Sequence, residues 1–246
     1  MFSFFQKKTP LTDLFSADFV DIHSHFLPNI DDGSKSMDES VAMLKRMHGY
    51  GIKNIICTPH VMESVWENSS ETIQQRLDAL NAHLKSIDFP DISVTAAAEY
   101  MLDANFEHLL KTENLRTLKD NYILVELSFL SAPVNLYETL FNIQIAGYKP
   151  VLAHPERYSY YHKDFKEYAK LKAAGCLFQI NLLSLSNYYG PSVTEASLQL
   201  LKQQLIDFAG TDTHKHQHLD FLEKVVDGKV LKLIEPVLKA NDFFKA

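Results

Sequence analysis

The stretch Asp21–Gly33 reads Asp-Ile-His-Ser-His-Phe-Leu-Pro-Asn-Ile-Asp-Asp-Gly and decides how the rest of the chain is interpreted. The apolar run leading into it predicts a buried strand over residues 19–23, which ends at His23 and His25. Because side chains alternate along a strand, these two imidazoles point to the same side. Two imidazoles with carboxylates one loop later form half of a metal site. A His-x-His pair alone is a weak motif, so the remaining ligands must come from elsewhere in the chain.

The composition fits one large α/β domain. The chain has 246 residues, 46% of them hydrophobic, which is a common length for a single barrel. The formal net charge of −7 argues against nucleic acid as the main partner. Two cysteines, Cys57 and Cys176, provide no disulfide framework and suit a reducing compartment. Neither a secretory signal nor an apolar run of about 18 residues is present. We therefore expect a cytoplasmic protein without membrane insertion; its oligomeric state stays open, a homo-oligomer included.

Seven strand-then-helix units follow one another along the chain. The predicted strands cover residues 19–23, 54–60, 92–98, 122–127, 150–154, 176–181 and 206–210. The predicted helices cover residues 37–50, 70–87, 103–111, 133–146, 164–174, 192–204 and 217–241, the last with breaks at Gly228 and Pro236. This alternation predicts a parallel sheet, closed as a barrel or doubly wound. Residues 1–17 are predicted to be an N-terminal extension, ahead of a single catalytic domain at residues 18–246.

Most of the predicted strands end at a residue that can bind metal. In parallel α/β folds the chemistry lies at the carboxyl ends of the strands. Six of the seven ends carry His, Asp or Glu, although these types make up only about one residue in six. Nitrogen and oxygen donors without thiolates suit two or three ions of manganese, iron or zinc. The nine candidate ligands, with the loop carboxylate included, are His23, His25, Asp32, His60, Glu99, Glu126, His154, Asp212 and His214.

Ordinary structural roles are the alternative for each candidate. Glu126, in an apolar strand, could pair with a buried Lys or Arg, because an unpaired buried carboxylate is costly. His60 and His154 each adjoin a proline and could be turn residues. His216 and His218 continue the alternation, but we expect them beyond the site, on a solvated helix start.

Taken together, the strand-end motifs resemble the PHP family, which is named for polymerase and histidinol phosphatase domains. The resemblance covers about residues 19–215, and within the family it is to the manganese-dependent protein-tyrosine phosphatases of bacterial capsule and exopolysaccharide operons. It implies a distorted seven-stranded (β/α) barrel. The motifs that carry it are Asp21-Ile22-His23-Ser24-His25, Asp31-Asp32-Gly33, Thr58-Pro59-His60, Ala98-Glu99, Val125-Glu126-Leu127-Ser128-Phe129, Ala153-His154-Pro155-Glu156-Arg157-Tyr158 and Gly210-Thr211-Asp212-Thr213-His214.

The resemblance also implies how the ligands divide among three manganese ions. One ion would be held by His23, His25, Glu99 and Asp212. Glu99 would bridge to a second ion, bound also by Glu126 and His154. The third would be held by Asp32, His60 and His214, which leaves Asp31 to hold the turn or to support a ligand.

Arg157 matches the family arginine that contacts the substrate phosphate. Relatives commonly have a further arginine after the Asp-x-His motif, but this chain has none, and Lys215 or His216 are the candidate substitutes. Aromatic residues predicted after strand ends could contact a phenyl ring or could simply pack in loops; they are Trp66, Tyr100, Tyr158, Tyr160, Tyr161, Tyr188 and Tyr189.

We expect a metal-dependent phosphomonoester hydrolase that acts on phosphotyrosine, by resemblance the tyrosine-rich tail of a polysaccharide-assembly kinase. Closely spaced ions would activate water for in-line attack while Arg157 neutralises the phosphate oxygens. The alternatives are a small-molecule phosphatase of the histidinol-phosphatase type, a barrel amidohydrolase, and a non-catalytic scaffold. Cysteine-phosphatase chemistry is disfavoured, because neither Cys57 nor Cys176 has an arginine six residues later.

Overall fold

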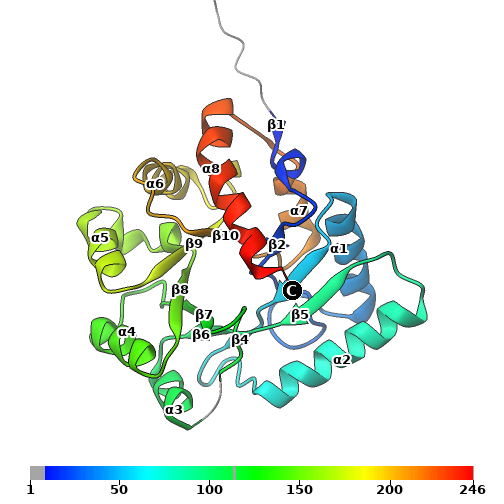
Figure 1. The fold of residues 1–246 in the computed structure, drawn as a ribbon, viewed down its shortest axis with the longest axis horizontal. Coiled ribbons are helices and arrows are strands. Elements are labelled where there is room, and N and C mark those ends of the chain that lie inside the picture. The colour runs from blue at the N-terminus through cyan, green and yellow to red at the C-terminus, as the bar shows by residue number, and fades with distance from the viewer. Residues whose placement is uncertain (1–8, 113–114, 246) are drawn as a thin grey trace, which may run out of the picture.

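The computed structural model describes residues 9–112 and 115–245 and contains nine parallel strands in two sheets (Figure 1). The smaller sheet has the order β2-β3-β5, with β2 at Val20–Asp21, β3 at Asn54–Cys57 and β5 at Ser93–Ala96. The larger sheet has the order β10-β9-β8-β7-β6-β4. Its strands, in chain order, are β4 (His60–Val61), β6 (Glu99–Met101), β7 (Tyr122–Glu126), β8 (Lys149–Ala153), β9 (Leu177–Asn181) and β10 (Phe208–Gly210).

The chain passes from the smaller to the larger sheet twice, once within the predicted strand 54–60 and once directly after the predicted strand 92–98. The predicted strand 54–60 becomes β3 and β4, and the predicted strand 92–98 becomes β5, with β6 directly after it. Pro59 lies at the first division, where it has no N–H to donate to a ladder. The division places His60 opposite Glu99 in the larger sheet, so two candidate ligands become neighbours.

Residues 23–25 connect the two sheets. The backbone N–H of His25 donates to Thr213 O (3.0 Å), and that of Thr58 donates to Ser24 O (2.8 Å). Ser24 and Thr213 form an isolated parallel bridge. A continuous seven-stranded ladder is not found among the described residues. The structure thus confirms an α/β fold with parallel sheets, whereas closure into a barrel is not confirmed.

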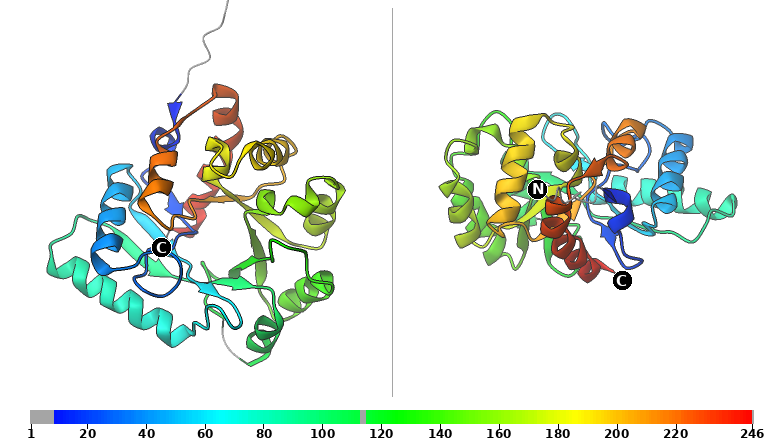
Figure 2. Two further views of the ribbon diagram at one scale, coloured as in Figure 1. Left: turned by 180° about the vertical axis from the view of Figure 1, so that it is seen from behind. Right: turned by 90° about the horizontal axis from the view of Figure 1, so that it is seen from above.

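The helices lie outside the strands, and helix α2 runs along the smaller sheet (Figures 1 and 2). Ser36 caps the first helix by accepting a hydrogen bond from the backbone N–H of Glu39 (3.1 Å). None of the described helices is long and apolar enough to cross a membrane. The helices are α1 (Met37–Gly49), α2 (Ser70–Ser86), α3 (Ala104–Thr112), α4 (Leu136–Ile145), α5 (Lys166–Ala173), α6 (Pro191–Lys202), α7 (His216–Leu222) and α8 (Gly228–Ala240).

The C-terminal part differs from the single interrupted helix predicted at residues 217–241. Helix α7 ends at Leu222, and the short strand β11 (Val225–Val226) separates it from α8. Gly228 begins α8, whereas the predicted break at Pro236 is wrong, because α8 continues past this proline.

The described part of the N-terminal segment packs against this region. Strand β1 (Thr9–Pro10) pairs antiparallel with β11, and Leu11 is fully buried in the main core. The domain boundary at residue 17 stays a prediction. Short 3₁₀ helices complete the chain at Leu11–Leu14, Pro155–Arg157, Ser159–Tyr161, Leu182–Ser186 and Asn241–Phe244.

Candidate metal centre

The nine candidate ligands converge where the two sheets meet, with the fully buried Glu99 at the centre. Glu99 Oε2 lies 3.1 Å from both His23 Nε2 and His60 Nδ1. Glu99 Oε1 lies 3.1 Å from His154 Nε2. One carboxylate therefore faces three imidazoles from distant parts of the chain, one after β2, one at the start of β4 and one after β8, the arrangement expected of a bridging ligand.

The other carboxylates link further imidazoles to this centre. Asp32 Oδ1 is 3.4 Å from Nε2 of both His60 and His214. Glu126 Oε1 is 2.9 Å from His60 Nδ1. Four overlapping groups have ligand atoms within 4.8 Å of one another: His25, Asp32, His60 and His214; His23, His154 and Asp212; His23, His25 and Glu99; and His60, Glu99 and Glu126.

Two of the fully buried imidazoles are oriented by a partner on the ring nitrogen that faces away from the centre. His23 Nδ1 lies 2.7 Å from Gln179 Oε1, and His25 Nδ1 lies 2.7 Å from Asp31 Oδ2. This arrangement is typical of metal-binding histidines, because it fixes the ring and presents Nε2 to the ion. The buried Nε2 of His25 makes no hydrogen bond. These donors fit a divalent cation.

The electrostatics of the cluster agree with this fit. Burial favours the neutral form of Glu99, but the imidazoles of His23 and His60 outweigh burial and hold the pKa of Glu99 well below its usual range. Burial, together with the charge of Glu99, raises the pKa of Glu126. Two crowded carboxylates of this kind are stabilised as a pair by bound cations.

Two of the candidate ligands have a left-handed backbone, His154 with φ 37° and Asp212 with φ 50°. Residues other than glycine adopt this conformation rarely and at a cost, and they do so most often at functional sites. His154 directly follows β8, and Asp212 lies two residues after β10. At both positions the side chain points toward the other candidate ligands.

A cavity of about 290 Å³ opens beside the ligands and contains Arg157. The Arg157 guanidinium lies 4.7 Å from the centre of the Phe129 ring and 4.2 Å from that of Tyr189. Its Nη1 donates to Asp212 Oδ2 (2.8 Å). A guanidinium that is held between two rings and points toward the candidate metal ligands can bind an anionic substrate.

The aromatic residues predicted after strand ends divide into those that line the cavity and those that do not. Tyr188 and Tyr189 line the cavity. Tyr158, predicted as a substrate contact, does not line it and is fully buried. Its hydroxyl donates to Ala153 O (3.1 Å) and accepts from Leu127 N (2.9 Å), and these two bonds hold the ring in the core. The structure therefore corrects the placement of Tyr158. Trp66, Tyr100, Tyr160 and Tyr161 are likewise not among the cavity residues.

His218 is a cavity residue that the sequence reasoning placed outside the site. It is buried, with Nδ1 3.1 Å from Asp212 O, and burial lowers its pKa to about 4. Its spacing of four residues from His214, at a helix start, was the signal that could have identified it. Lys215 lines the cavity as well, whereas His216, the other candidate substitute for the missing arginine, does not.

Glu156 is a further buried residue next to Arg157, and no sequence pattern indicated a role for it. Its Oε1 accepts hydrogen bonds from Asn181 N (2.9 Å) and Ser184 Oγ (2.7 Å). Burial raises its pKa to about 7. The carboxyl joins the turn that carries Arg157 to the end of β9.

The chain matches, over residues 19–220, a family described as capsular polysaccharide synthesis, CpsB/CapC. It is 32% identical over 203 residues to the tyrosine-protein phosphatase YwqE of Bacillus subtilis (strain 168), covering 82% of this chain and 80% of that protein. It is also 32% identical over 203 residues to the tyrosine-protein phosphatase CpsB of Streptococcus pneumoniae, covering 79% of this chain and 82% of that protein.

Solved structures give the same picture. Crystal structures of YwqE and CpsB from these two species are described as those of unique metal-dependent tyrosine phosphatases. One matches with a TM-score of 0.77 and 30% identity, covering 88% of this chain and 86% of that chain. A histidinol phosphate phosphatase of Lactococcus lactis matches with a TM-score of 0.52 and 13% identity, covering 89% of this chain and 94% of that chain. The second likeness extends to the fold alone.

Proposed function

Since this chain belongs to the CpsB/CapC family of capsular polysaccharide synthesis proteins, we propose that it is a metal-dependent protein-tyrosine phosphatase. The observation that carries the proposal is the convergence of imidazoles and carboxylates beside a cavity that contains an aromatically framed arginine. The enzyme hydrolyses the phosphate monoester of tyrosine, which gives a free phenol and inorganic phosphate.

The finer assignment concerns the metal. We propose manganese, in two or three sites formed by the nine residues named above, with Glu99 as the bridging carboxylate. Divalent ions there would lower the pKa of water and withdraw charge from the phosphate. Mixed imidazole and carboxylate donors support manganese, iron or zinc in this position.

Arg157 is proposed to bind the transferred phosphate. A guanidinium is planar and can donate to two phosphate oxygens at once, and the flanking rings of Phe129 and Tyr189 restrict its orientation. These rings and Tyr188 also supply aromatic surface for the phenyl group of the substrate. Lys215 is proposed as a second contact for the phosphate.

A cysteine nucleophile is not supported. Cys57 and Cys176 are both buried, and burial raises the pKa of each thiol to about 12. Such a thiol is protonated near neutral pH and is a poor nucleophile.

The proposed substrate is the phosphotyrosine tail of a tyrosine kinase of polysaccharide biosynthesis, met in the cytoplasm. The family description and the names of the relatives support this class of partner. For the fold, we retain the prediction of a distorted seven-stranded barrel and of a single catalytic domain at residues 18–246. The hydrogen bonds that link residues 23–25 to both sheets support that prediction.

The test uses the metal-stripped full chain, reconstituted with manganese, on three substrates: a phosphotyrosine peptide, a phosphoserine peptide and histidinol phosphate. We expect hydrolysis of the phosphotyrosine peptide only with metal, and faster than hydrolysis of the other two. Activity confined to histidinol phosphate would support the small-molecule phosphatase alternative. No activity on any substrate would support the scaffold.

A further inference from the structure

Large apolar side chains are exposed along one side of the molecule, and they are concentrated in one segment. Nine are exposed among the described residues, and six of these lie between Phe129 and Ile145. Leu130 is 92% exposed, Phe141 62% and Ile145 71%. We call Leu130, Val134, Tyr137, Phe141 and Ile145 the apolar stripe.

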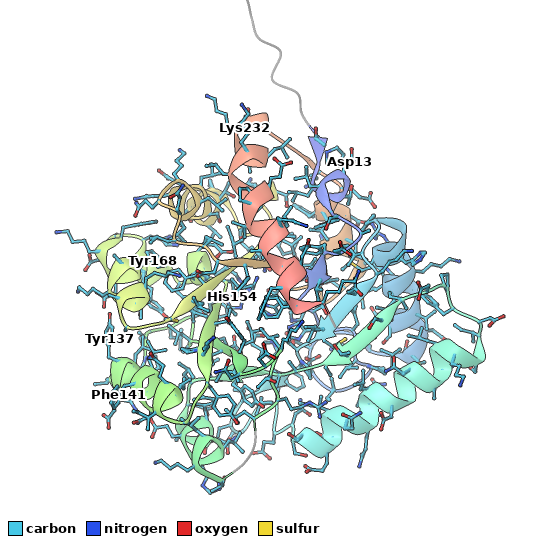
Figure 3. The ribbon with its side chains drawn as sticks, viewed as in Figure 1. Asp13, Tyr137, Phe141, His154, Tyr168 and Lys232 are labelled. Atoms are coloured by element: carbon cyan, nitrogen blue, oxygen red, sulfur yellow. The ribbon has the colours of Figure 1, made fainter. Side chains whose placement is uncertain are left out.

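Tyr137, Phe141 and Ile145 of the apolar stripe lie on the outer face of helix α4, and Leu130 and Val134 lie in the segment just before it. The inner face, with Leu136, Leu140 and Ile143, is buried in the core. Figure 3 shows Tyr137 and Phe141 at the outer margin of the molecule. A helix that is apolar on two faces leaves one face available to a partner.

The segment is also almost without charge. Glu138 is the single charged residue between positions 129 and 148 of the sequence. Glu167 of α5 adds one carboxylate at the edge of the stripe, where it accepts a hydrogen bond from the Tyr137 hydroxyl. Around Leu130, Val134, Phe141 and Ile145 the segment itself presents no other charge than Glu138, so an apolar partner fits better than a charged one.

The stripe continues into the catalytic cavity through Phe129. The Phe129 ring lines the cavity, contacts the Arg157 guanidinium (4.7 Å) and lies 5.6 Å from the His154 ring. Leu130, the next residue, begins the exposed stripe. A second copy of the chain seated on Leu130 would lie at the mouth of the cavity and hinder a protein substrate. A segment of the protein substrate would instead extend from the cavity onto the stripe.

We propose that the apolar stripe binds an apolar segment of the phosphotyrosine protein, rich in Leu, Ile, Phe or Tyr and flanking the phosphotyrosine. This inference rests on the proposed function and adds a determinant of substrate choice outside the cavity. The ten residues of α4 span about 15 Å, a length that roughly five extended residues cover. Free phosphotyrosine cannot reach the stripe, whereas a peptide with six or more residues on the correct side can.

The test compares two phosphotyrosyl peptides of equal length and charge on the manganese-loaded full chain. One has Leu, Ile and Phe on both sides of the phosphotyrosine, and the other has Ser and Gly there. We expect about a tenfold higher kcat/KM for the apolar peptide, which arises in KM. The double variant Phe141→Gln, Ile145→Gln should remove this preference and leave turnover of p-nitrophenyl phosphate unchanged. Gln is a good helix former, so α4 should persist.

The matched control is Ile87→Gln, which changes another exposed apolar residue at the end of α2, 45% exposed, and should alter neither peptide. Equal turnover of the two peptides, or an unchanged preference in the double variant, overturns the inference. A change in oligomeric state by light scattering, with the preference retained, assigns the stripe to a contact between copies and overturns it as well. If p-nitrophenyl phosphate and both peptides are not hydrolysed, the proposed function fails. Fluorescence anisotropy of the labelled peptides then still decides whether the stripe binds.

Discussion

Arg157 connects the candidate metal centre to the substrate cavity through a single side chain. Its Nη1 donates to Asp212, a proposed ligand, while its flat faces contact Phe129 and Tyr189. A guanidinium has five N–H donors, so one bond to a carboxylate leaves others for a phosphate. The same residue can therefore orient Asp212 and bind substrate. Loss of the first role would weaken metal binding, whereas loss of the second would slow turnover with the metal retained.

Arg157→Ala is expected to reduce kcat/KM for a phosphotyrosine peptide by about 10²-fold or more, because a donor directed at the phosphate oxygens is lost. Arg157→Lys should lie between wild type and Ala, since it keeps the charge but not the planar fork. Steady-state kinetics measure both effects, and metal per chain is measured by mass spectrometry. Retained metal supports a substrate role; loss of metal would show that Arg157 is structural.

Glu156 makes stability depend on pH. Burial raises the pKa of its carboxyl from 4.5 to about 7 in the folded chain. The folded state therefore binds more protons than the unfolded state between these values. The contribution of Glu156 to the free energy of unfolding is therefore fully present below about pH 4.5 and is lost as the pH rises through 7, by on the order of 1–3 kcal/mol.

The substitution Glu156→Gln removes the ionisation and keeps the acceptor for Asn181 and Ser184. Urea unfolding in chelator at pH 5 and pH 8 should therefore show a smaller pH difference in the variant than in wild type. An equal difference in both proteins would mean that Glu156 ionises without cost in the folded chain.

At the scale of elements, the strand ends were predictable and the division of the strands was not. Apolar runs followed by helices locate strands, and their carboxyl ends locate ligands, because both follow from local pattern. Which sheet a strand joins depends on pairing with distant segments, as for His60 beside Glu99. Pro59 was the one local sign of a division.

Side chains beyond the strand ends were predicted less well, for a similar reason. Their direction depends on packing that the sequence pattern does not contain. Tyr158 turns inward because its hydroxyl finds two backbone partners, and His218 turns into the cavity because its ring bonds Asp212 O. The exposure of the apolar stripe was not predicted, because an apolar residue in a helix is ordinarily assumed to be buried.

The loop after the first strand depends on a residue without a side chain. A Cβ at Gly33 would lie 2.2 Å from His25 O, which is backbone and cannot move away cheaply. Gly33→Ala is therefore expected to destabilise the fold by about 1–3 kcal/mol and to weaken metal binding through the displaced Asp32.

The matched control is Gly49→Ala, at the end of α1, where a Cβ meets nothing within 4 Å. It should be neutral or stabilise by up to about 1 kcal/mol, because alanine is the better helix former. Urea unfolding and metal titration measure both variants. If Gly33→Ala matches Gly49→Ala in both assays, the loop tolerates the added methyl.

For the whole molecule, the C-terminal region holds the two sheets together away from the site. The buried Asn241 side chain accepts from Ala209 N (2.9 Å) and donates to Val20 O (2.8 Å). Ala209 lies in β10 of the larger sheet and Val20 in β2 of the smaller one. On the side where the candidate metal ligands lie, carboxylates face one another between the two sheets. Bound cations would hold the sheets together there.

Removal of divalent metal is expected to lower the thermal stability of the whole molecule. A cation at 100 times its Kd contributes about 2.7 kcal/mol, which for a chain of this size is a shift in Tm of roughly 5–10 °C. Chelation should produce this loss in wild type, and added manganese should reverse it. Glu99→Gln, which removes the central carboxylate, should lower the manganese-dependent shift, whereas Glu138→Gln on the exposed face of α4 should keep it. Differential scanning fluorimetry with chelator and with manganese measures all three proteins. Equal melting temperatures in both conditions for wild type would contradict a structural role for the metal, because the repulsion among Glu99, Glu126 and Asp212 would then be balanced by their imidazole neighbours alone.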